Sequence, residues 1–332
     1  MDGEMDQRAE LRKPTRAPTR DGVTAAASRI AEILPPTPLL PVELDGSTLW
    51  AKAECLQPVG AFKIRGAWNR LVSLPKGERE RGVVAVSSGN HAQGVAWAAR
   101  ELLMPATIIM PSDAPRVKMD RVREMGAQIV EYDRMKQDRE AIAMTLCDKR
   151  ACAYVHAFAD PWVIEGQGSA GVELAGQMNR QAGGPVERIV TCCGGGGLAS
   201  GLALACPDAE IVTVEPEGWD DVARSLADGV RRSVGENPPT TACDALQTFA
   251  TFKVNFDVMR AHDVRGIWVS EAETRAAQRY AFERLRLVLE PGGAVALAAM
   301  LSGKLPPGPR TAVMLTGGNV DPASFASVLA GE

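Results

Sequence analysis

Short runs of β-branched and other apolar residues alternate along this chain with longer segments of helical periodicity. The strand-like runs are residues 83–86, 107–110, 129–132, 189–193, 210–215 and 312–315. The helical segments are residues 23–34, 91–103, 116–125, 134–147, 198–205, 271–287 and 294–301. Strands that alternate with helices form βαβ units, in which the strands are parallel and the helices cover the sheet. The alternation therefore predicts an α/β protein with open, twisted and mostly parallel sheets flanked by helices.

The composition agrees with a globular protein of this class. The chain has 332 residues, of which 45% are hydrophobic and 23% are charged. This length allows about two domains of roughly 150 residues each. The formal net charge of −4 lacks the basic excess expected of a nucleic-acid-binding or membrane-surface protein. No apolar run approaches the ~18 residues of a membrane span. We therefore expect neither a nucleic acid nor a membrane as a partner.

The cysteines and the N-terminal segment bear on the cellular compartment. None of the seven cysteines forms a C-x-x-C pair, so we predict neither a disulfide framework nor a zinc site. This usage is typical of the reducing cytoplasm. Residues 1–22 combine charges with prolines and contain few apolar residues. They are predicted to form a flexible tail and not a secretory signal.

Four of the predicted strands are followed directly by glycine-bearing loops. These loops are residues 87–90, 194–197, 216–218 and 316–319. In open parallel sheets, ligands bind beyond the carboxyl ends of the strands. We therefore predict that the four loops together build one binding site.

The loop at 194–197 consists of four glycines and leads directly into an apolar helix. Its amides can approach a phosphate closely, and the helix N-terminus adds partial positive charge. A phosphate site is favoured over a flexible turn. Gly194, Gly196 and Ala199 also fit G-x-G-x-x-A, with Glu215 about 20 residues further on, near the position of a ribose-binding acid. An NAD-binding dehydrogenase or a nucleotide-binding module therefore remains an alternative.

Lys63 lies in the apolar, glycine-flanked segment G-A-F-K-I-R-G-A at residues 60–67. Partial removal of water from a lysine lowers the pKa of its amine and makes the amine a better nucleophile. An ordinary surface lysine is the other interpretation, and Lys63 alone does not decide between the two.

Seven motifs, taken together and in order, are more specific than any one of them. They are GAFKIRGA (60–67), SSGNHAQGVA (87–96), HAFADPWVIEGQGSAGVEL (156–174), GGGGLASG (194–201), VEPEGWDD (214–221), EPGGAVALAA (290–299) and TGGNVD (316–321). In this order they resemble fold-type II pyridoxal-phosphate enzymes, most closely the serine/threonine dehydratase and serine racemase family. The resemblance extends over roughly residues 30–325. It explains Lys63, Asn90 and Thr316, which a nicotinamide-binding protein would leave without a role.

The resemblance implies a tryptophan synthase β-like fold of two domains, with the cofactor in the cleft between them. Residues 23–81 and 160–332 would form a large cofactor-binding domain, and residues 82–159 a small inserted domain. It further implies pyridoxal 5'-phosphate as the cofactor, a small amino acid as the substrate and a homodimer as the assembly.

The same resemblance implies roles for individual residues. Lys63 would carry the cofactor covalently and remove the Cα proton of the substrate. Phe62 would pack near the cofactor ring, Asn90 would bind its 3-hydroxyl group, and Thr316 would meet its pyridine nitrogen. Backbone amides would hold the phosphate, and they belong to Gly194, Gly195, Gly196, Gly197 and Leu198.

A neutral hydroxyl at the pyridine nitrogen bears on the reaction type. A carboxylate there would keep the nitrogen protonated, whereas the hydroxyl of Thr316 stabilises a carbanion at Cα less and so favours immediate loss of a β-hydroxyl group. We therefore predict a dehydratase, or ammonia-lyase. Its substrate would be a small L-3-hydroxy amino acid such as L-threonine or L-serine, and its products a 2-oxo acid and ammonia.

Ser88 leaves two further activities open. In racemase-like members the matching serine lies on the cofactor face opposite the lysine and returns a proton there. Serine racemase or 3-hydroxyaspartate ammonia-lyase is therefore the alternative, and a β-replacement synthase of the same fold is another. The other interpretation of Ser88 is a hydroxyl that caps or stiffens the loop. His91 in this loop is interpreted as structural.

Glu215, Trp219 and Asp221 match the divalent-cation site of the racemase and hydroxyaspartate-lyase members. Two carboxylates, the backbone carbonyl of Trp219 and waters would suit Mg²⁺, and equally Ca²⁺ or Mn²⁺. The ion would be structural and take no part in the chemistry. A solvated acidic turn is the other interpretation.

The chain departs from the family pattern at several positions. Ala61 replaces a serine that usually precedes Phe-Lys, and Ala157 replaces the proline of a His-Pro-Phe run. A loop that usually contains Pro-Gly reads T-F-A-T-F at residues 248–252. We expect this loop to border the pocket, where Phe249 or Phe252 would change its size and polarity. These departures bear on the identity of the substrate more than on the reaction type.

Overall fold

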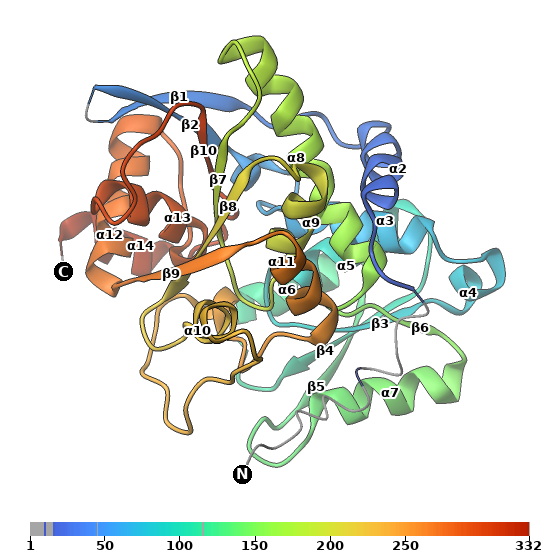
Figure 1. Cartoon of the computed structure of the whole chain (residues 1–332). Helices are drawn as coiled ribbons and strands as arrows, with labels where there is room; N and C mark the ends of the chain where they lie inside the picture. Colours follow the sequence, from blue (N-terminus) through green and yellow to red (C-terminus); the bar gives the residue numbers. More distant parts are fainter. Residues whose placement is uncertain (1–9, 11–15, 45, 115, 332) are drawn as a thin grey trace.

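The structure, a computed structural model, describes residues 10, 16–44, 46–114 and 116–331 and contains two β-sheets (Figure 1). The larger sheet has the strand order β1-β2-β10-β7-β8-β9, and the smaller sheet has the order β5-β4-β3-β6. The strands of the larger sheet are β1 (Leu39–Leu44), β2 (Ser47–Lys52), β7 (Arg188–Cys192), β8 (Glu210–Pro216), β9 (Arg265–Val269) and β10 (Thr311–Met314). Those of the smaller sheet are β3 (Val83–Val86), β4 (Ala106–Pro111), β5 (Gln128–Tyr132) and β6 (Ala153–Tyr154).

Neighbouring strands run parallel in both sheets, with one exception. The exception is the antiparallel hairpin of β1 and β2, which pairs Leu44 with Ser47. All six predicted strands are present, and their ends differ from the prediction by no more than one residue. The prediction of an α/β fold with open, mostly parallel sheets is therefore confirmed.

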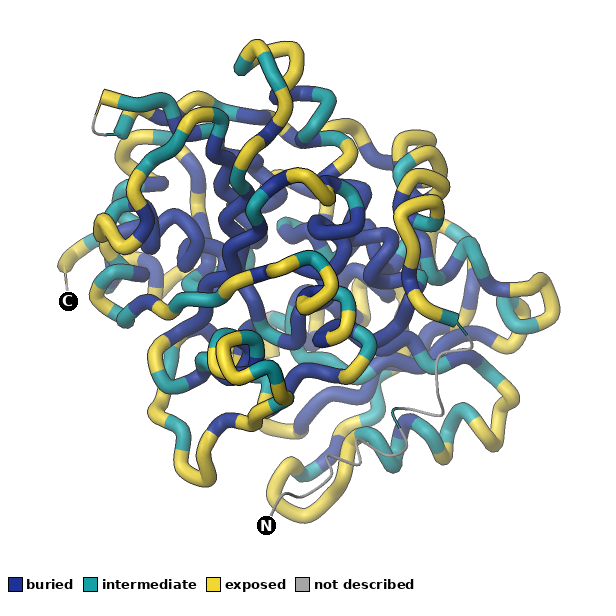
Figure 2. Tube along the Cα trace, in the orientation of Figure 1, coloured by how far each residue is buried: buried dark blue, intermediate teal, exposed yellow. Residues whose placement is uncertain are grey.

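Helices cover both faces of the larger sheet. Helices α12 (Glu271–Tyr280) and α13 (Pro291–Leu301) pack on one face, and α8 (Pro161–Gln181) and α9 (Gly197–Ala205) pack on the other. Successive strand residues point to opposite faces, so Ile189 joins the core beside α8 and α9, while Val190 joins the core beside α13. Because such strands are buried on both faces, they appear in the sequence as continuous apolar runs, and Figure 2 shows them as the dark, buried centre of the molecule.

The smaller sheet is covered in the same way. Helices α5 (Asn90–Glu101) and α6 (Arg116–Glu124) lie against one face, and α7 (Arg139–Arg150) lies against the other. Helix α7 begins later than the predicted segment 134–147, because the Asp138 side chain accepts hydrogen bonds from the amides of Glu140 and Ala141 and acts as the N-cap. The four strands and their helices come from one continuous stretch of chain, and the assignment of residues 82–159 to a separate domain stays a prediction.

Helix α3 (Lys63–Val72) joins the two halves of the molecule, because it packs on α8 and on α5. The contact with α8 is close: a Cβ atom on Gly166 would lie 2.7 Å from the Cα atom of Gly66. A side chain at Gly166 would push the two helices apart. This packing places Lys63, the first residue of α3, at the junction of the two sheets.

Helix α2 (Arg20–Ala31) begins inside the predicted N-terminal tail. The Thr19 side chain accepts a hydrogen bond from the amide of Gly22 and caps the first turn, and Arg16 forms an ion pair of 2.5 Å with Glu165. The helix expected at residues 23–34 therefore starts three residues earlier and ends at Ala31. Most of the remaining predicted tail lies outside the described residues.

The other helices complete the surface around the sheets. The helix predicted at 271–287 is interrupted, because α12 ends at Tyr280 and a π-helix follows it. No helix in the described part of the chain has both the length and the apolar character that a membrane span needs. The remaining helices are α4 (Lys76–Arg81), α10 (Asp221–Asp228), α11 (Lys253–Ala261), α14 (Pro322–Ala330), the 3₁₀-helices η1 (Glu54–Leu56) and η2 (Asp244–Leu246), and the π-helix η3 (Ala281–Leu285).

A group of buried charged side chains anchors α3. Arg65 is 1% exposed, and its Nε and Nη2 atoms donate to the two carboxylate oxygens of Glu54 at 2.7 and 2.8 Å. Arg65 also donates to Glu173 at 2.8 Å, and Glu173 in turn accepts a hydrogen bond from the buried Lys52. Buried charges are tolerated when they are paired and hydrogen-bonded in this way. The pairs tie the start of α3 to η1, α8 and β2.

Removal of Glu54 would leave the buried Arg65 and Lys52 to share one carboxylate, that of Glu173. We predict that Glu54→Ala lowers the free energy of unfolding, measured by urea denaturation, by about 3–5 kcal/mol. Asp120→Ala is the control, because it breaks the exposed ion pair with Arg123 and is expected to cost less than about 1 kcal/mol. Equal losses in the two variants would contradict the anchoring role of the buried pair.

Candidate functional site

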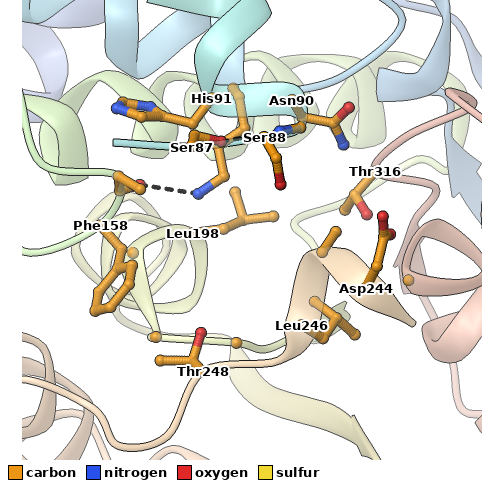
Figure 3. A pocket seen from close by; sticks show the side chains of 18 of the residues that line it. Ser87, Ser88, Asn90, His91, Phe158, Leu198, Asp244, Leu246, Thr248 and Thr316 are labelled. Atoms are coloured by element: carbon orange, nitrogen blue, oxygen red, sulfur yellow. Dashed lines mark hydrogen bonds between the residues drawn. The ribbon is translucent and has the colours of Figure 1, made fainter. Parts of the chain in front are cut away.

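A cavity opens at the carboxyl ends of strands from both sheets. The loops that follow β3, β6, β7 and β10 line it, together with the start of α3. Figure 3 shows Ser88, Asn90, Leu198 and Thr316 around this cavity. The structure thus brings together all of the residues predicted for catalysis and cofactor binding, which are Phe62, Lys63, Ser88, Asn90, Gly194, Gly195, Gly196, Gly197, Leu198 and Thr316.

Three of the four glycine-bearing loops meet at this cavity. The loops at 87–90, 194–197 and 316–319 contribute lining residues, whereas the loop at 216–218 does not. The prediction of one site built from all four loops is therefore wrong. The reason lies in the strand order: β8 is on the far side of β7 from β10, so its carboxyl end lies away from the cavity.

Lys63 points its amine at the carbonyl oxygen of Ala157, to which Nζ donates a hydrogen bond of 2.8 Å. Burial lowers the pKa of Lys63 from 10.5 to about 8. A large share of the amine is therefore neutral near pH 8, and a neutral amine is a nucleophile and a base. Ala157, which departs from the family pattern, supplies this contact through its backbone.

The four-glycine loop connects the end of β7 to the first residue of α9. Gly196 has a positive φ of 89°, a conformation that side chains disfavour. The ring of Phe158 lies over the loop so closely that a Cβ atom on Gly195 would be 2.2 Å from it. The first amides of α9 have no partners within the helix, and this N-terminus faces the cavity through Gly197 and Leu198. The geometry suits an anion such as a phosphate.

Thr316 and Asn90 both line the cavity, and Figure 3 shows both on the right-hand side of this view. Thr316 is 3% exposed, and its hydroxyl oxygen lies 3.3 Å from the Cys192 sulfur. Burial raises the pKa of the Cys192 thiol to about 11, so the thiol is uncharged at neutral pH. Thr316 therefore offers the cavity a neutral hydroxyl group.

Two histidines, His91 and His156, line the cavity, and both are neutral at physiological pH. The Nε2 atom of His91 lies 2.9 Å from the carbonyl oxygen of Val155, and burial lowers the pKa of His91 to about 3. Nδ1 of His156 accepts hydrogen bonds from the amides of Phe158 and Ala159, and burial holds the pKa of His156 well below 6.5. The Nε2 contact agrees with the structural interpretation of His91, whereas the buried Nδ1 atom of His91 has no partner among the described residues.

Ser88 and Ser87 have different surroundings. The Ser87 hydroxyl accepts a hydrogen bond of 3.1 Å from the amide of Gly89 and thereby stiffens the loop. Within the described residues the Ser88 side chain has no hydrogen bond, and it faces the cavity (Figure 3). The loop-stiffening role proposed for Ser88 therefore belongs to its neighbour, and the Ser88 hydroxyl is available to a bound molecule.

The carboxylates predicted to bind a cation lie together outside this cavity. Glu215 is completely buried at the end of β8 and accepts hydrogen bonds from the amides of Val222 and Ala223 at 3.1 and 2.7 Å. Asp221 begins α10, and its buried Oδ2 atom has no partner among the described residues. Burial and the neighbouring Asp221 raise the pKa of Glu215 well above its usual range, and burial raises that of Asp221 to about 7.

This donor set fits a hard divalent cation. Two buried carboxylates repel each other unless a cation or a proton lies between them, and Asp221 keeps a buried oxygen unpaired. The described residues contain no cluster of three or more His, Cys, Asp and Glu side chains suited to a metal. A third protein ligand would therefore have to be a carbonyl, and Trp219 lies buried in the turn between the two carboxylates.

The loop at residues 244–252 borders the cavity differently from the prediction. Asp244, Leu246 and Thr248 line it, whereas Phe249 and Phe252 are not among the lining residues. Phe249 is 62% exposed and packs on Trp219. Phe252 packs behind the cavity, where it contacts His156 and Phe158. Its influence on the cavity therefore passes through these two aromatic side chains.

Several lining residues were not identified from the sequence. Glu290 and Asn319 lie within the motifs EPGGAVALAA and TGGNVD, where a charged or amide side chain beside consecutive glycines was the available signal. Lys118 and Arg139 also line the cavity, but they come from helices with many charges, and nothing in the sequence separates them from surface residues.

The chain is similar to proteins of known activity. A family model described as "Pyridoxal-phosphate dependent enzyme" matches residues 30–317. The chain is 41% identical to an L-threo-3-hydroxyaspartate ammonia-lyase of Pseudomonas sp, over 86% of this chain and 89% of that protein. It is 35% identical to a serine racemase of Schizosaccharomyces pombe, over 94% of this chain and 97% of the racemase. A solved structure of a T.th. threonine deaminase superimposes with a TM-score of 0.84 at 39% identity, covering 92% of this chain and 99% of that one.

The burial of Lys63 predicts an unusual pH dependence of its reactivity. The neutral fraction of its amine rises through pH 8, because burial lowers the pKa of Lys63 to about 8. Competitive acetylation of the cofactor-free protein at a series of pH values, followed by peptide mass spectrometry, measures this rise. The exposed Lys76 serves as the internal reference for the reagent. Reactivity of Lys63 that is still rising steeply at pH 10 would contradict the predicted pKa.

Proposed function

The chain belongs to the pyridoxal-phosphate dependent enzyme family, and we propose that it is an ammonia-lyase that dehydrates and deaminates a small L-3-hydroxy amino acid such as L-serine or L-threonine. The observation that carries this proposal is the position of Lys63, whose amine shares one cavity with the four-glycine loop. A reactive amine beside a phosphate cradle is what covalently bound pyridoxal phosphate requires. The products would be ammonia and a 2-oxo acid.

The residues around Lys63 are suited to hold the cofactor. The amides of residues 194–198 would bind its phosphate at the N-terminus of α9. Phe62, 8% exposed beside Lys63, would pack on the ring. Asn90 would donate to the 3-oxygen, and Thr316 would meet the pyridine nitrogen. All four groups line the same cavity, which supports these assignments.

Bound pyridoxal phosphate supplies an electron sink for the substrate's Cα atom. Lys63 Nζ removes the Cα proton, and its lowered pKa of about 8 makes it an effective base near neutral pH. Thr316 presents a neutral hydroxyl beside the uncharged Cys192 thiol. A neutral partner of the pyridine nitrogen limits the electron sink. It therefore favours prompt loss of the substrate's 3-hydroxyl group over transamination.

Serine racemase activity is a second candidate, and one observation favours it. The Ser88 hydroxyl faces the cavity without a hydrogen bond among the described residues. A free hydroxyl there would return a proton to Cα from the face opposite Lys63, which inverts the configuration. The relative from Schizosaccharomyces pombe is named serine racemase.

Basic side chains at the cavity favour a dicarboxylic substrate within the same reaction class. Lys118 and Arg139 both line the cavity. Lys118 already forms a 2.5 Å ion pair with Asp244, whereas the ion pair of Arg139 with Glu140 is much longer, at 3.8 Å. Arg139 would therefore be the group that binds a second substrate carboxylate. The relative from Pseudomonas sp is named for such a substrate, L-threo-3-hydroxyaspartate.

We also propose a structural divalent cation, Mg²⁺ or alternatively Ca²⁺ or Mn²⁺, between Glu215 and Asp221. The unpaired buried oxygen of Asp221 supports it, as does the mutual repulsion of the two carboxylates. The backbone carbonyl of Trp219 and waters would complete the oxygen ligands. Because the pair lies outside the cavity, the cation would stabilise the fold and leave the chemistry to Lys63.

The assembly and the cellular location are also proposals. A homodimer follows from the family likeness. A cytoplasmic location is supported by the seven cysteines, all of which are free. A small domain at residues 82–159 is supported by its own parallel sheet and by the apolar cluster between that sheet and α7.

The activity itself is tested by measuring 2-oxo acid release from L-serine, L-threonine and L-threo-3-hydroxyaspartate, with chiral analysis of the remaining substrate. We expect turnover of at least one of them and its loss in Lys63→Ala, because the variant lacks the amine. Lys76→Ala, which removes an exposed lysine outside the cavity, is the control. A protein that is yellow from bound pyridoxal phosphate but releases no 2-oxo acid from any of the three substrates would refute the ammonia-lyase proposal. Full activity of Lys63→Ala would refute the role of Lys63.

The dicarboxylic-substrate proposal predicts a selective effect of Arg139→Ala. We expect kcat/KM for L-threo-3-hydroxyaspartate to fall about 10- to 100-fold, since a hydrogen bond to a charged group contributes roughly 1.5–3 kcal/mol. The value for L-serine should change little. Arg134→Ala is the matched control, because Arg134 is exposed and pairs with Asp113. An equal fall for both substrates would contradict specific recognition of the second carboxylate.

The cation proposal predicts a metal-dependent change in thermal stability. Saturating Mg²⁺ is expected to raise the midpoint of thermal unfolding by roughly 5 °C, because a ligand that binds only the folded state stabilises it by about 2.7 kcal/mol at a hundredfold excess over Kd. Asp221→Asn should abolish this rise. Glu217→Gln, which changes an exposed neighbour, should preserve it. An undiminished rise in Asp221→Asn would place the ion elsewhere.

A further inference from the structure

Glu290 and Asn319 flank the carboxamide of Asn90, and neither has a role in the function proposed above. Asn90 donates from Nδ2 to the Oε1 atom of Glu290 at 2.5 Å. Its Oδ1 atom accepts a hydrogen bond of 2.8 Å from Nδ2 of Asn319. Asn319 Nδ2 also donates to the carbonyl oxygen of Val59 at 2.8 Å. A continuous chain of hydrogen bonds therefore runs from a backbone carbonyl through two amides to a carboxylate.

These hydrogen bonds determine which way the Asn90 amide faces. The Val59 carbonyl at one end can only accept, so Asn319 must present its NH₂ group there, and the second hydrogen of that group meets Asn90 Oδ1. Glu290 at the other end accepts when ionised, so it binds the NH₂ group of Asn90. Rotation of Asn90 by half a turn would set two donors against each other and two acceptors against each other.

One hydrogen of the Asn90 NH₂ group is left over. The amide nitrogen has two donors, and Glu290 takes one of them. Asn90 lines the cavity on the same side as Thr316 (Figure 3). The remaining N–H is therefore available to a bound molecule, while the carbonyl oxygen is held by Asn319.

Two glycines make room for this arrangement. A Cβ atom on Gly317 would lie 2.0 Å from Oε1 of Glu290, and a Cβ atom on Gly60 would lie 2.7 Å from Oδ1 of Asn319. Both flanking side chains thus occupy space that any other residue at these glycines would fill. Glu290 is 6% exposed. Burial raises its pKa to about 7, and the hydrogen bond from Asn90 opposes this rise because it stabilises the buried carboxylate.

We propose that Glu290 and Asn319 are positioning residues that orient the Asn90 amide so that its free N–H meets the 3-oxygen of the cofactor ring. This inference rests on the proposed function, in which Asn90 binds that oxygen. Glu290 and Asn319 act through Asn90 and touch no reacting atom. Without Glu290 and Asn319, the Asn90 amide alternates between two orientations. In one of them its carbonyl oxygen faces and repels the ionised 3-oxygen of the cofactor.

The test is a double-mutant cycle on the holoenzyme without substrate. Glu290→Ala and Glu290→Gln are compared in the wild-type and Asn90→Ala backgrounds, and Asn319→Ala is treated in the same way. The measurements are the rate of pyridoxal phosphate loss on dilution and the pH midpoint of the cofactor's visible absorption. Glu80→Gln, which removes an exposed carboxylate outside the cavity, is the control.

We expect Glu290→Ala to speed cofactor loss roughly 3- to 10-fold, the effect of one hydrogen bond, and to raise the pH midpoint, because the N–H stabilises the ionised 3-oxygen. Glu290→Gln keeps an accepting oxygen and should remain close to wild type, which also guards against a general folding defect. In the Asn90→Ala background Glu290→Ala should add nothing further.

An equal effect of Glu290→Ala with and without Asn90 would overturn the proposal, as would a Glu290→Ala holoenzyme indistinguishable from wild type. Failure of the underlying function gives a different result. In that case the wild-type chain gains no visible absorption with pyridoxal phosphate, whatever the variants do.

Discussion

The structure depends on holding one half-buried amine in place where its two sheets meet. Lys63 is the first residue of α3, and the buried ion pairs of Arg65 with Glu54 and Glu173 anchor this helix two residues later. The close glycine contact between α3 and α8 prevents the helix from shifting. Because the position of the amine is set by buried charges and backbone contact, its burial is a property of the fold. The lowered pKa of Lys63 follows from this burial.

Three titratable side chains that interact with that amine are uncharged at neutral pH. His91 and His156 are neutral because they are buried, and the Cys192 thiol keeps its proton for the same reason. The amides at the N-terminus of α9 leave a place for an anion, and this place exists because four consecutive residues lack side chains. A neutral base next to an anion-binding loop is the arrangement that covalent catalysis with a phosphorylated aldehyde cofactor requires. The chain's own contribution is thus positioning and electrostatics.

Patterns of neighbouring residues in the sequence predicted the elements that depend mainly on those residues. The doubly buried strands appear as apolar runs, so β3, β7, β8 and β10 were found almost to the residue. Strands β1, β2, β6 and β9 were missed. Pro41 and Glu43 interrupt the apolar residues of β1, polar residues begin β2 and β9, and β6 has only two residues. The long helix α8 was missed as an element although its sequence was noted as a motif.

Ser87, not Ser88, stiffens its loop, and sequence spacing does not distinguish adjacent hydroxyls. Glu290 and Asn319 reach Asn90 from at least 200 residues away, and only the strand order brings them together.

The central claim is that Lys63 carries the cofactor. Borohydride reduction of the protein loaded with pyridoxal phosphate, followed by proteolysis and peptide mass spectrometry, tests this claim directly, since reduction makes the link between the cofactor and its lysine permanent. The account predicts a single pyridoxyl label on the peptide that contains Lys63. A label on a different lysine, or a protein that takes up no label, would contradict it.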